Sequence, residues 1–365
     1  SVEGAWRAYA ELSSRLEPVV LELLSELWRL RKRQSKAFGR SVAKEAEKKA
    51  IETARYVIPV ACHTAMVYTV SGLTLHRLRR MAAACDASRE ARTLVDRMVA
   101  EVERIDPAFF REIGDDPLES ADVQEFSLAP ARLGDPAALE AFDKSLDGRR
   151  ARLVDYGLRG PEVIADAVRQ VIGQPDLDDE SALGCVLDPA RNRRRLEPLD
   201  VSAHSPLMRT LHHANYTFKK KLSHSADSQD QRHRMVPASR PLLTRTVPGF
   251  VDVVEPELIA SDPACQGIFR ESVEAAWEAR GRLLELGSPP ELALYVLPNA
   301  LAVRFEESGS LLHLLHKWSM RTCLNAQREI FEASLDEIEQ VRACLLYTSP
   351  SPRDHLAHLV CRLLL

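Results

Sequence analysis

Two segments of this chain match each other at a constant separation of 239 residues, from Tyr56 to Tyr295. YVIP at 56–59 aligns without a gap on YVLP at 295–298, and ASRE at 87–90 aligns on AQRE at 326–329. This period is too long for a solenoid of short repeats. The repeat therefore predicts two copies of one domain, of which the first lacks its N-terminal part.

Composition agrees with folded domains and excludes several classes of protein. The 365 residues are 45% hydrophobic and 28% charged, which is typical of a globular protein rather than a disordered one. A net charge of -4 gives no global basic field for nucleic acid or an anionic membrane. Seven cysteines without a CxxC pair predict neither a disulfide framework nor a zinc site, and they suit a cytoplasmic location. The first residues do not show the order of charged, apolar and small residues that is typical of a signal peptide.

The final segment, residues 344–365, has a different character. It contains CLLYTSPSPRD and HLVCRLLL, which resemble a sequencing-library adapter translated in one frame. We therefore expect it to be non-native and exclude it from fold reasoning, as one would an expression scar. The alternative is a genuine Pro/Ser-containing tail.

Helical periodicity predicts most of the secondary structure. Apolar residues at helical spacing predict a helix over 3–56. Its basic cluster at 29–36 indicates either a solvated helix face or a phosphate-binding one, and the basic stretch 29–49 leaves a nucleic-acid-binding helical protein as a minor hypothesis. The uncharged segment 56–76 is long enough to span a bilayer. The second copy carries Arg304, Glu306 and Glu307 there, which argues against a span. Further helices are predicted at 87–110, 136–147, 161–172, 264–287 and 307–343.

Turn signals and short apolar runs predict the remainder. Asp and Pro dominate 114–211, and 176–206 reads as a mobile linker. Strands are predicted around 213–222 and 243–254, so the fold class is helix-rich α+β. The predicted organisation is a first copy at 1–112, a connecting region at 113–205, a second copy at 206–343 and the non-native tail.

Two polar clusters could carry chemistry. The first is QDQRHR at 229–234, in which two arginines flank a histidine, a combination suited to a phosphate or pyrophosphate. The ordinary interpretation of such a segment is a solvated turn. The second lies in the last helices and contains Arg304, His313, His316, Arg321, Gln327 and Glu329. A snorkelling helix arginine is the ordinary interpretation of Arg304.

These clusters resemble the signatures of the flavin-dependent thymidylate synthases. Within 212–234 the matching residues are His213, Thr217-Phe218, Ser223, Gln229 and Arg232-His233-Arg234. Within 291–330 the family pattern A-R-x-V-L-P, an arginine, L-R and A-Q-x-E-I is matched at Pro298, Arg304, Arg321, Ala326-Gln327 and Glu329-Ile330. The resemblance covers about 202–343 as one nearly complete copy. Residues 45–112 resemble the C-terminal part of another.

The resemblance implies an enzyme that methylates dUMP to dTMP. Methylenetetrahydrofolate would supply the carbon, and NADPH the hydride through FAD. It implies a small antiparallel sheet wrapped by helices in each copy, and no metal. The FAD-binding residues it implies are His213, Arg232, His233, Arg234, Ser310 and His316. The dUMP-binding residues it implies are Gln229, Arg232, Arg304, Arg321 and Gln327, with Arg304 on the phosphate and Arg321 polarising the uracil in catalysis.

Departures from the family pattern leave two hypotheses open. Pro237 replaces a serine after R-H-R, which removes a hydroxyl and a backbone donor. Ser310 and Leu312 replace the family's N-x-R, and the first copy has Ala65, Ala82 and Ser88 at the positions of Arg304, Arg321 and Gln327. The first hypothesis is an active fused enzyme in which two chains self-associate into a pseudo-tetramer. The alternative is a catalytically inactive or altered flavin- or nucleotide-binding relative that acts as an oligomer partner.

Overall fold

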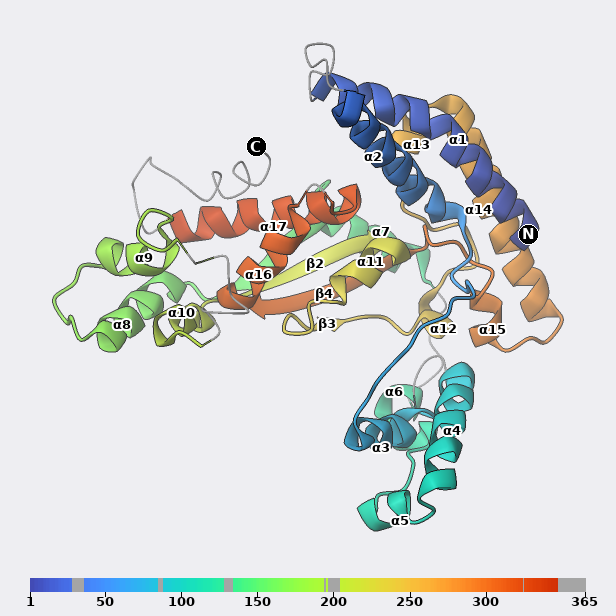
Figure 1. Cartoon of the computed structure of the whole chain (residues 1–365), viewed down its shortest axis with the longest axis horizontal. Coiled ribbons are helices and arrows are strands. Elements are labelled where there is room, and N and C mark those ends of the chain that lie inside the picture. The colour runs from blue at the N-terminus through green and yellow to red at the C-terminus, as the bar shows by residue number, and fades with distance from the viewer. Residues whose placement is uncertain are drawn as a thin grey trace. The chain divides into compact units, whose positions relative to one another are not determined.

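The structure is a computed structural model, shown in Figure 1. It describes residues 1–27, 36–84, 88–127, 134–193, 195, 204–323 and 325–346. The chain divides into two compact units. The first comprises Ser1–Asp135, Leu242–Asp252 and Leu258–Asn299, and the second comprises Pro136–Pro241, Val253–Glu257 and the chain from Ala300 onward.

A helical hairpin forms much of the first unit. Helices α1 (Val2–Leu27) and α2 (Lys36–Ala54) pack together, and α14 (Pro263–Glu285) packs against α1. Leu12 and Leu16 are fully buried in this packing, as helical spacing predicted. The single helix predicted over 3–56 is wrong, because two helices cover this range. Most of the basic cluster at 29–36 falls outside the described residues.

Shorter helices complete the first unit. The helices α3 (Gly72–Met81), α4 (Ser88–Ile105) and α5 (Phe109–Ile113) surround a small core of Leu75, Val95, Val99 and Phe110. The remaining short elements are η2 (Arg55–Val57), η3 (Ser120–Asp122), α6 (Gln124–Ser127), α12 (Leu243–Thr246) and α15 (Pro290–Leu294), with α13 (Glu257–Ala260) beginning at the boundary. No helix among the described residues is long and apolar enough to cross a membrane.

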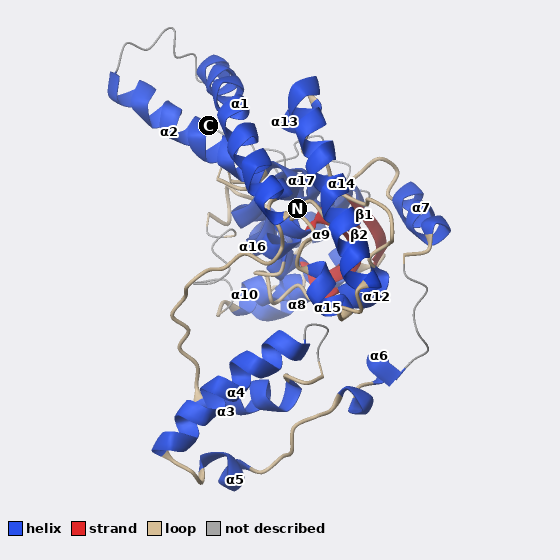
Figure 2. Cartoon of the chain, turned by 90° about the vertical axis from the view of Figure 1, so that its right-hand side faces the viewer, coloured by secondary structure: helices blue, strands red, loops and turns tan. Residues whose placement is uncertain are grey.

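The second unit contains a four-stranded antiparallel sheet, drawn in red in Figure 2. Its strands are β1 (Ala151–Tyr156), β2 (Asn215–Ser223), β3 (Ala238–Ser239) and β4 (Ala302–Ser310), in the order β1-β2-β4-β3. The central pair runs in continuous register from Asn215↔Ser310 to Ser223↔Ala302. The prediction of a helix-rich α+β fold with a small antiparallel sheet is confirmed.

Two sequence-based assignments are corrected here. The helix predicted over 307–343 is wrong at its start, because 307–310 belong to β4, whose residues alternate between sheet faces. The strand predicted around 243–254 is replaced by α12 and by extended chain that makes a single bridge, Val253↔Leu301. Strand β1 was not predicted.

Helices enclose the sheet and bury its apolar residues. They are α7 (Pro136–Ser145), α8 (Gly160–Ile172), α9 (Asp179–Leu187), α10 (Pro206–Arg209), η5 (Thr210–His213), α11 (His224–Asp230), α16 (Leu311–Arg321) and α17 (Arg328–Leu346). Phe218, Leu314 and Trp318 lie in the resulting core. The expected linker at 176–206 is wrong where α9 forms a capped helix, and 196–203 lie outside the described residues. In Figure 1, α11, α16 and α17 gather around β2 and β4.

Candidate functional site

The turn from β2 into α11 anchors the site. Ser223 caps α11, since its Oγ accepts a hydrogen bond from the Ala226 amide at 3.1 Å. The Ser223 amide and hydroxyl both donate to the Glu329 carboxylate, at 2.5 and 2.6 Å. Ser223 and Glu329 are both buried. The start of α11 is therefore fixed to α17, and the following QDQRHR segment has a defined position.

Four of the predicted residues meet in what we call the polar cluster: Gln229, His233, Arg321 and Gln327. Arg321 donates from Nε to His233 Nε2 at 2.7 Å and from Nη2 to the Gln229 carbonyl oxygen at 2.7 Å. Its Nη1 is 3.4 Å from Gln229 Oε1. Gln229 Nε2 donates to Gln327 Oε1 at 2.6 Å. Residues 98 positions apart are thus joined side chain to side chain.

The electrostatics of the polar cluster place a permanent cation against a neutral imidazole. Burial and the nearby Arg321 guanidinium lower the pKa of His233 to about 4. Burial, together with Arg232, lowers the pKa of Arg321, but a guanidinium stays charged at any physiological pH. His233 Nε2 therefore accepts the hydrogen bond from Arg321, and Arg321 keeps its charge for a ligand.

We expect His233 to remain neutral through the physiological range. Its depressed pKa means that the native state binds fewer protons than the unfolded state, so its contribution to stability is complete above about pH 6.5. That contribution is lost as pH falls toward about 4. Titration of the His233 ring by NMR should show no transition between pH 8 and 5. A midpoint between pH 6 and 7 would contradict the Arg321–His233 geometry.

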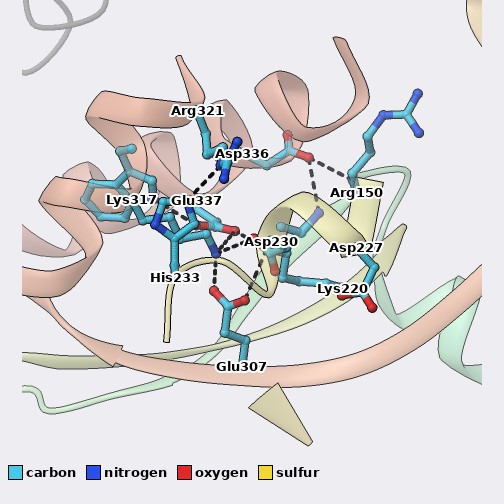
Figure 3. A network of polar contacts seen from close by, with 12 residues as sticks. Arg150, Lys220, Asp227, Asp230, His233, Glu307, Lys317, Arg321, Asp336 and Glu337 are labelled. Atoms are coloured by element: carbon cyan, nitrogen blue, oxygen red, sulfur yellow. Dashed lines mark hydrogen bonds and ion pairs between the residues drawn. The ribbon is translucent and has the colours of Figure 1, made fainter. Parts of the chain in front are cut away.

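Beneath the polar cluster lies a group that we call the charge network, shown in Figure 3: Lys220, Asp230, Glu307, Lys317 and Glu337. All five side chains are 0–1% exposed. Lys220 Nζ is 2.8 Å from Glu337 and 2.9 Å from Asp230, and Lys317 Nζ is 3.1 Å from Asp230 and also contacts Glu307. The network thus joins β2, β4, α11, α16 and α17.

The charge network holds two cations and three carboxylates, so one carboxylate is favoured in its neutral form. Although burial favours neutral acids, Lys220 and Lys317 lower the pKa of Asp230 and Glu337. Burial raises the pKa of Glu307 to about 8, and the neighbouring Asp230 adds to that rise. Near neutral pH the network is therefore balanced by a proton on Glu307.

The other predicted site residues lie elsewhere or on the surface. Arg304 points to the sheet face opposite Glu307, three residues along β4. There it forms a two-pronged ion pair with Asp143 of α7, at 2.7 and 2.8 Å. The structure therefore does not bring Arg304 to the polar cluster. His213, Arg232 and Arg234 are exposed.

Two further predicted residues, His316 and Ser310, each lie beside a histidine ring. The His316 and His233 rings lie edge to face, with centroids 5.8 Å apart. Ser310 is buried and lies 3.3 Å from His313 Nδ1, and the His313 ring packs edge to face on His212 at 4.5 Å. His316 thus adjoins the polar cluster, whereas Ser310 belongs to a separate pair of histidines.

A cavity of about 530 Å³ in the second unit contains none of the predicted site residues. Its cations are already paired, Arg150 with Glu332 at 2.7 Å and Lys221 with Asp143 at 2.6 Å. Such pairing leaves little positive charge for an anionic ligand. No group of three or more His, Cys, Asp or Glu among the described residues could hold a metal ion.

Sequence reasoning missed two features. The charge network was missed because its members are scattered over more than 100 residues and one strand was taken for a helix. The second is Arg55. The A-R-x-V-L-P pattern has Leu294 in the second segment, whereas the first reads Ala54-Arg55-Tyr56-Val57-Ile58-Pro59 and keeps the arginine. Applying that pattern to both segments would have found it.

Comparison with known proteins places these features in one family. The model of the family "Thymidylate synthase complementing protein" matches residues 1–108 and 152–345. A flavin-dependent thymidylate synthase of Clostridium tetani is 35% identical over 114 residues, covering 31% of this chain and 39% of the relative. Proteins of the same name from Geobacter sulfurreducens (29% over 160 residues; 41% and 68%) and Haloarcula marismortui (40% over 72 residues; 20% and 29%) also match. The chain therefore spans only part of the length of these relatives.

Proposed function

Because the chain belongs to the thymidylate synthase complementing protein family, we propose that it acts as a flavin-dependent thymidylate synthase. The proposed reaction methylates dUMP to dTMP, with methylenetetrahydrofolate as carbon donor and NADPH as reductant. One observation carries the proposal: Arg321 is held by Gln229 and His233 in a half-buried polar cluster built from both family signatures. The names and identities of the relatives support it.

The residues present suit a flavin. His233 is a neutral imidazole that is only 9% exposed, and the partly exposed His316 ring lies edge to face beside it, so the pair offers aromatic surface to a planar ring. Arg232 and Arg234 flank His233 and are exposed, so their guanidinium groups can bind a diphosphate. When bound, the flavin would supply the hydride chemistry that amino-acid side chains lack.

The polar cluster suits the pyrimidine of dUMP. Arg321 carries a permanent charge in a site partly shielded from water, where it would stabilise negative charge developing on the ring. The amides of Gln229 and Gln327 offer the donors and acceptors that a uracil edge requires. We assign dUMP binding to these residues and Arg232. Arg304 would have to leave Asp143 to reach a phosphate, so we assign it a structural role.

We also propose that the chain is a fusion of two related copies. Helix α3 (Gly72–Met81) begins 239 residues before α16 (Leu311–Arg321). Helices α4 and α17, at Ser88–Ile105 and Arg328–Leu346, follow at nearly the same separation. Ser71 and Ser310 precede the first pair with nearly identical backbone angles, φ -71 and ψ 156 against φ -75 and ψ 155.

A symmetric backbone contact within the first unit also supports the two-copy proposal. Pro59 and Pro298, which the repeat equates, form an antiparallel bridge with each other. The Val60 amide donates to the Leu297 carbonyl at 2.7 Å, and the Asn299 amide donates to the Ile58 carbonyl at 2.9 Å. Val60 and Asn299 are equivalent positions of the repeat, and so are Ile58 and Leu297. The two hydrogen bonds are therefore related by a local two-fold axis. We further propose that two such chains associate into an assembly of four copies.

The test is made on the purified full chain loaded with FAD. We expect a yellow protein whose reduced flavin, kept under anaerobic conditions with methylenetetrahydrofolate, is reoxidised only when dUMP is added. Deoxyuridine, which differs from dUMP only by lacking the phosphate, is the control ligand. A protein that retains flavin but ignores dUMP would favour the altered-relative alternative, to which Pro237 in the loop after Arg234 points. A colourless protein would refute the flavin assignment.

A further inference from the structure

We propose that the charge network is a positioning device for the polar cluster: Lys317 and Asp230 fix α16 against α11, so that Arg321 stays aligned with Gln229 and His233. Its consequence for turnover rests on the proposed function above. The positioning itself can be tested without any activity.

Two members of the charge network are close neighbours of polar-cluster residues along the chain. Lys317 lies four residues before Arg321 on α16, hence one helical turn away on the same face. Asp230 follows Gln229 on α11, and its carbonyl accepts the His233 amide at 3.0 Å. Lys317 Nζ lies 3.1 Å from Asp230 Oδ1. A single buried ion pair therefore connects the two helices that present Arg321 and its partners.

The remaining members prevent this pair from shifting. Glu307 of β4 contacts Lys317 and lies 3.5 Å from Lys220 of β2. Glu337 of α17 lies 2.8 Å from Lys220 and accepts a hydrogen bond from Trp318 Nε1, also at 2.8 Å. Because buried charges must keep their partners, every displacement of α16 relative to the sheet would break several of these contacts at once.

The first segment shows that such helices pack without charges. At the repeat separation of 239 residues, Lys317 and Glu337 correspond to Leu78 and Met98, which pack partly buried against an apolar core between α3 and α4. Glu307 corresponds to Tyr68 and Arg321 to Ala82. The charges thus occur in the segment that keeps the arginine and are absent from the segment that lost it. Packing alone does not require them, which points to a role in placing Arg321.

The decisive variant replaces three members by their counterparts in the first segment: Glu307→Tyr, Lys317→Leu and Glu337→Met together. It removes two carboxylates and one cation, and it leaves Lys220 and Asp230 as a balanced pair at 2.9 Å. Replacing buried ion pairs by apolar residues is often neutral or stabilising, so the variant should fold. The matched control is Lys219→Met with Glu306→Gln, an adjacent pair at 3.8 Å on the other face of the same two strands.

Two readouts separate positioning from mere stability. The first is exchange of the Arg321 Nε proton with water, measured by NMR, which reports the bond to His233 directly. We expect it to accelerate at least about tenfold in the triple variant while the thermal midpoint changes little. The second is flavin reoxidation, for which kcat should fall at least about tenfold and the KM for dUMP should change far less, because small misplacements cost large factors in rate. The control should match wild type in both.

A second variant covers the case in which the triple variant does not fold. Glu307→Gln keeps the shape of the side chain but can no longer gain or lose a proton. The charged groups around Glu307 are Lys220, Lys317, Asp230 and Glu337. Arg240 lies one step further out, 3.7 Å from Asp230. In wild type, Arg321 proton exchange, corrected for base catalysis, should change between pH 7 and 9. In Glu307→Gln this change should disappear.

The outcomes are distinguishable. Unchanged Arg321 exchange in a folded triple variant, or a wild-type pH profile identical to that of Glu307→Gln, would overturn the positioning proposal. Wild-type protein without dUMP-dependent reoxidation would overturn the proposed function, while the exchange measurements would still decide on positioning.

Discussion

The Arg321→Ala variant is expected to lose at least about 100-fold in dUMP-dependent flavin reoxidation and to remain folded. Removing a single preorganised donor from developing negative charge costs about 100- to 1000-fold in rate. The substitution leaves the Gln229 carbonyl and His233 Nε2 without their donor, each a 2.7 Å contact in the wild type. Because the site is only half buried, water can replace the lost donor, and we expect a stability loss of about 1–3 kcal/mol.

Steady-state reoxidation kinetics and thermal unfolding together test this expectation. The matched control is Arg159→Ala, which removes a 77% exposed arginine paired with Glu162 in the same unit. The control should keep both turnover and thermal midpoint. Turnover by Arg321→Ala within about threefold of wild type would remove Arg321 from the proposed mechanism, since a threefold change is well below the effect of a lost oxyanion-type donor.

The Lys220→Met variant is expected to be the most destabilised single variant of the second unit. Lys220 is fully buried and lies within 3.5 Å of Asp230, Glu307 and Glu337. Removing one partner from a buried ion network leaves uncompensated charge and costs about 3–5 kcal/mol. Burial alone would lower the pKa of Lys220, but the adjacent Asp230, Glu307 and Glu337 outweigh it and raise that pKa well above its ordinary value, so the lost group is a cation at every accessible pH.

Urea unfolding at pH 7 measures this loss. Its control is Lys219→Met, the preceding residue on β2, which faces Glu306 at 3.8 Å and is partly exposed. That variant should lie within about 0.5 kcal/mol of wild type, as exposed pairs contribute little. A loss below about 1 kcal/mol for Lys220→Met would mean that the charge network does not form as described, because a broken buried pair costs more.

Sequence predicted the members of the polar cluster better than their surroundings. The two motifs predict Gln229, Arg321 and Gln327 as dUMP-binding residues and His233 as an FAD-binding residue, and the structure brings these four side chains together. Within each motif the side chains lie close together because the spacing along α11 and around the α16–α17 turn is local. Arg304 was assigned to the same site, yet strand alternation places it on the opposite face, where Asp143 binds it.

Tertiary contacts account for the remaining differences. AVRFEESGS at 302–310 contains residues that favour helices, and only pairing with β2 over nine residues makes it a strand. Lys220 and Glu307 read as solvent-facing charges in isolation, because charged residues are almost never fully buried unless paired. Their partners Asp230, Lys317 and Glu337 come from three other elements, so no local pattern could reveal the pairing.

We propose that this chain converts dUMP to dTMP at a site built around Arg321. The most direct test incubates the full chain with FAD, NADPH, methylenetetrahydrofolate and dUMP labelled with tritium at carbon 5. We expect tritium release into water with matching formation of dTMP, both abolished in Arg321→Ala. Flavin-loaded wild-type protein that releases no tritium and forms no dTMP would contradict the proposed function.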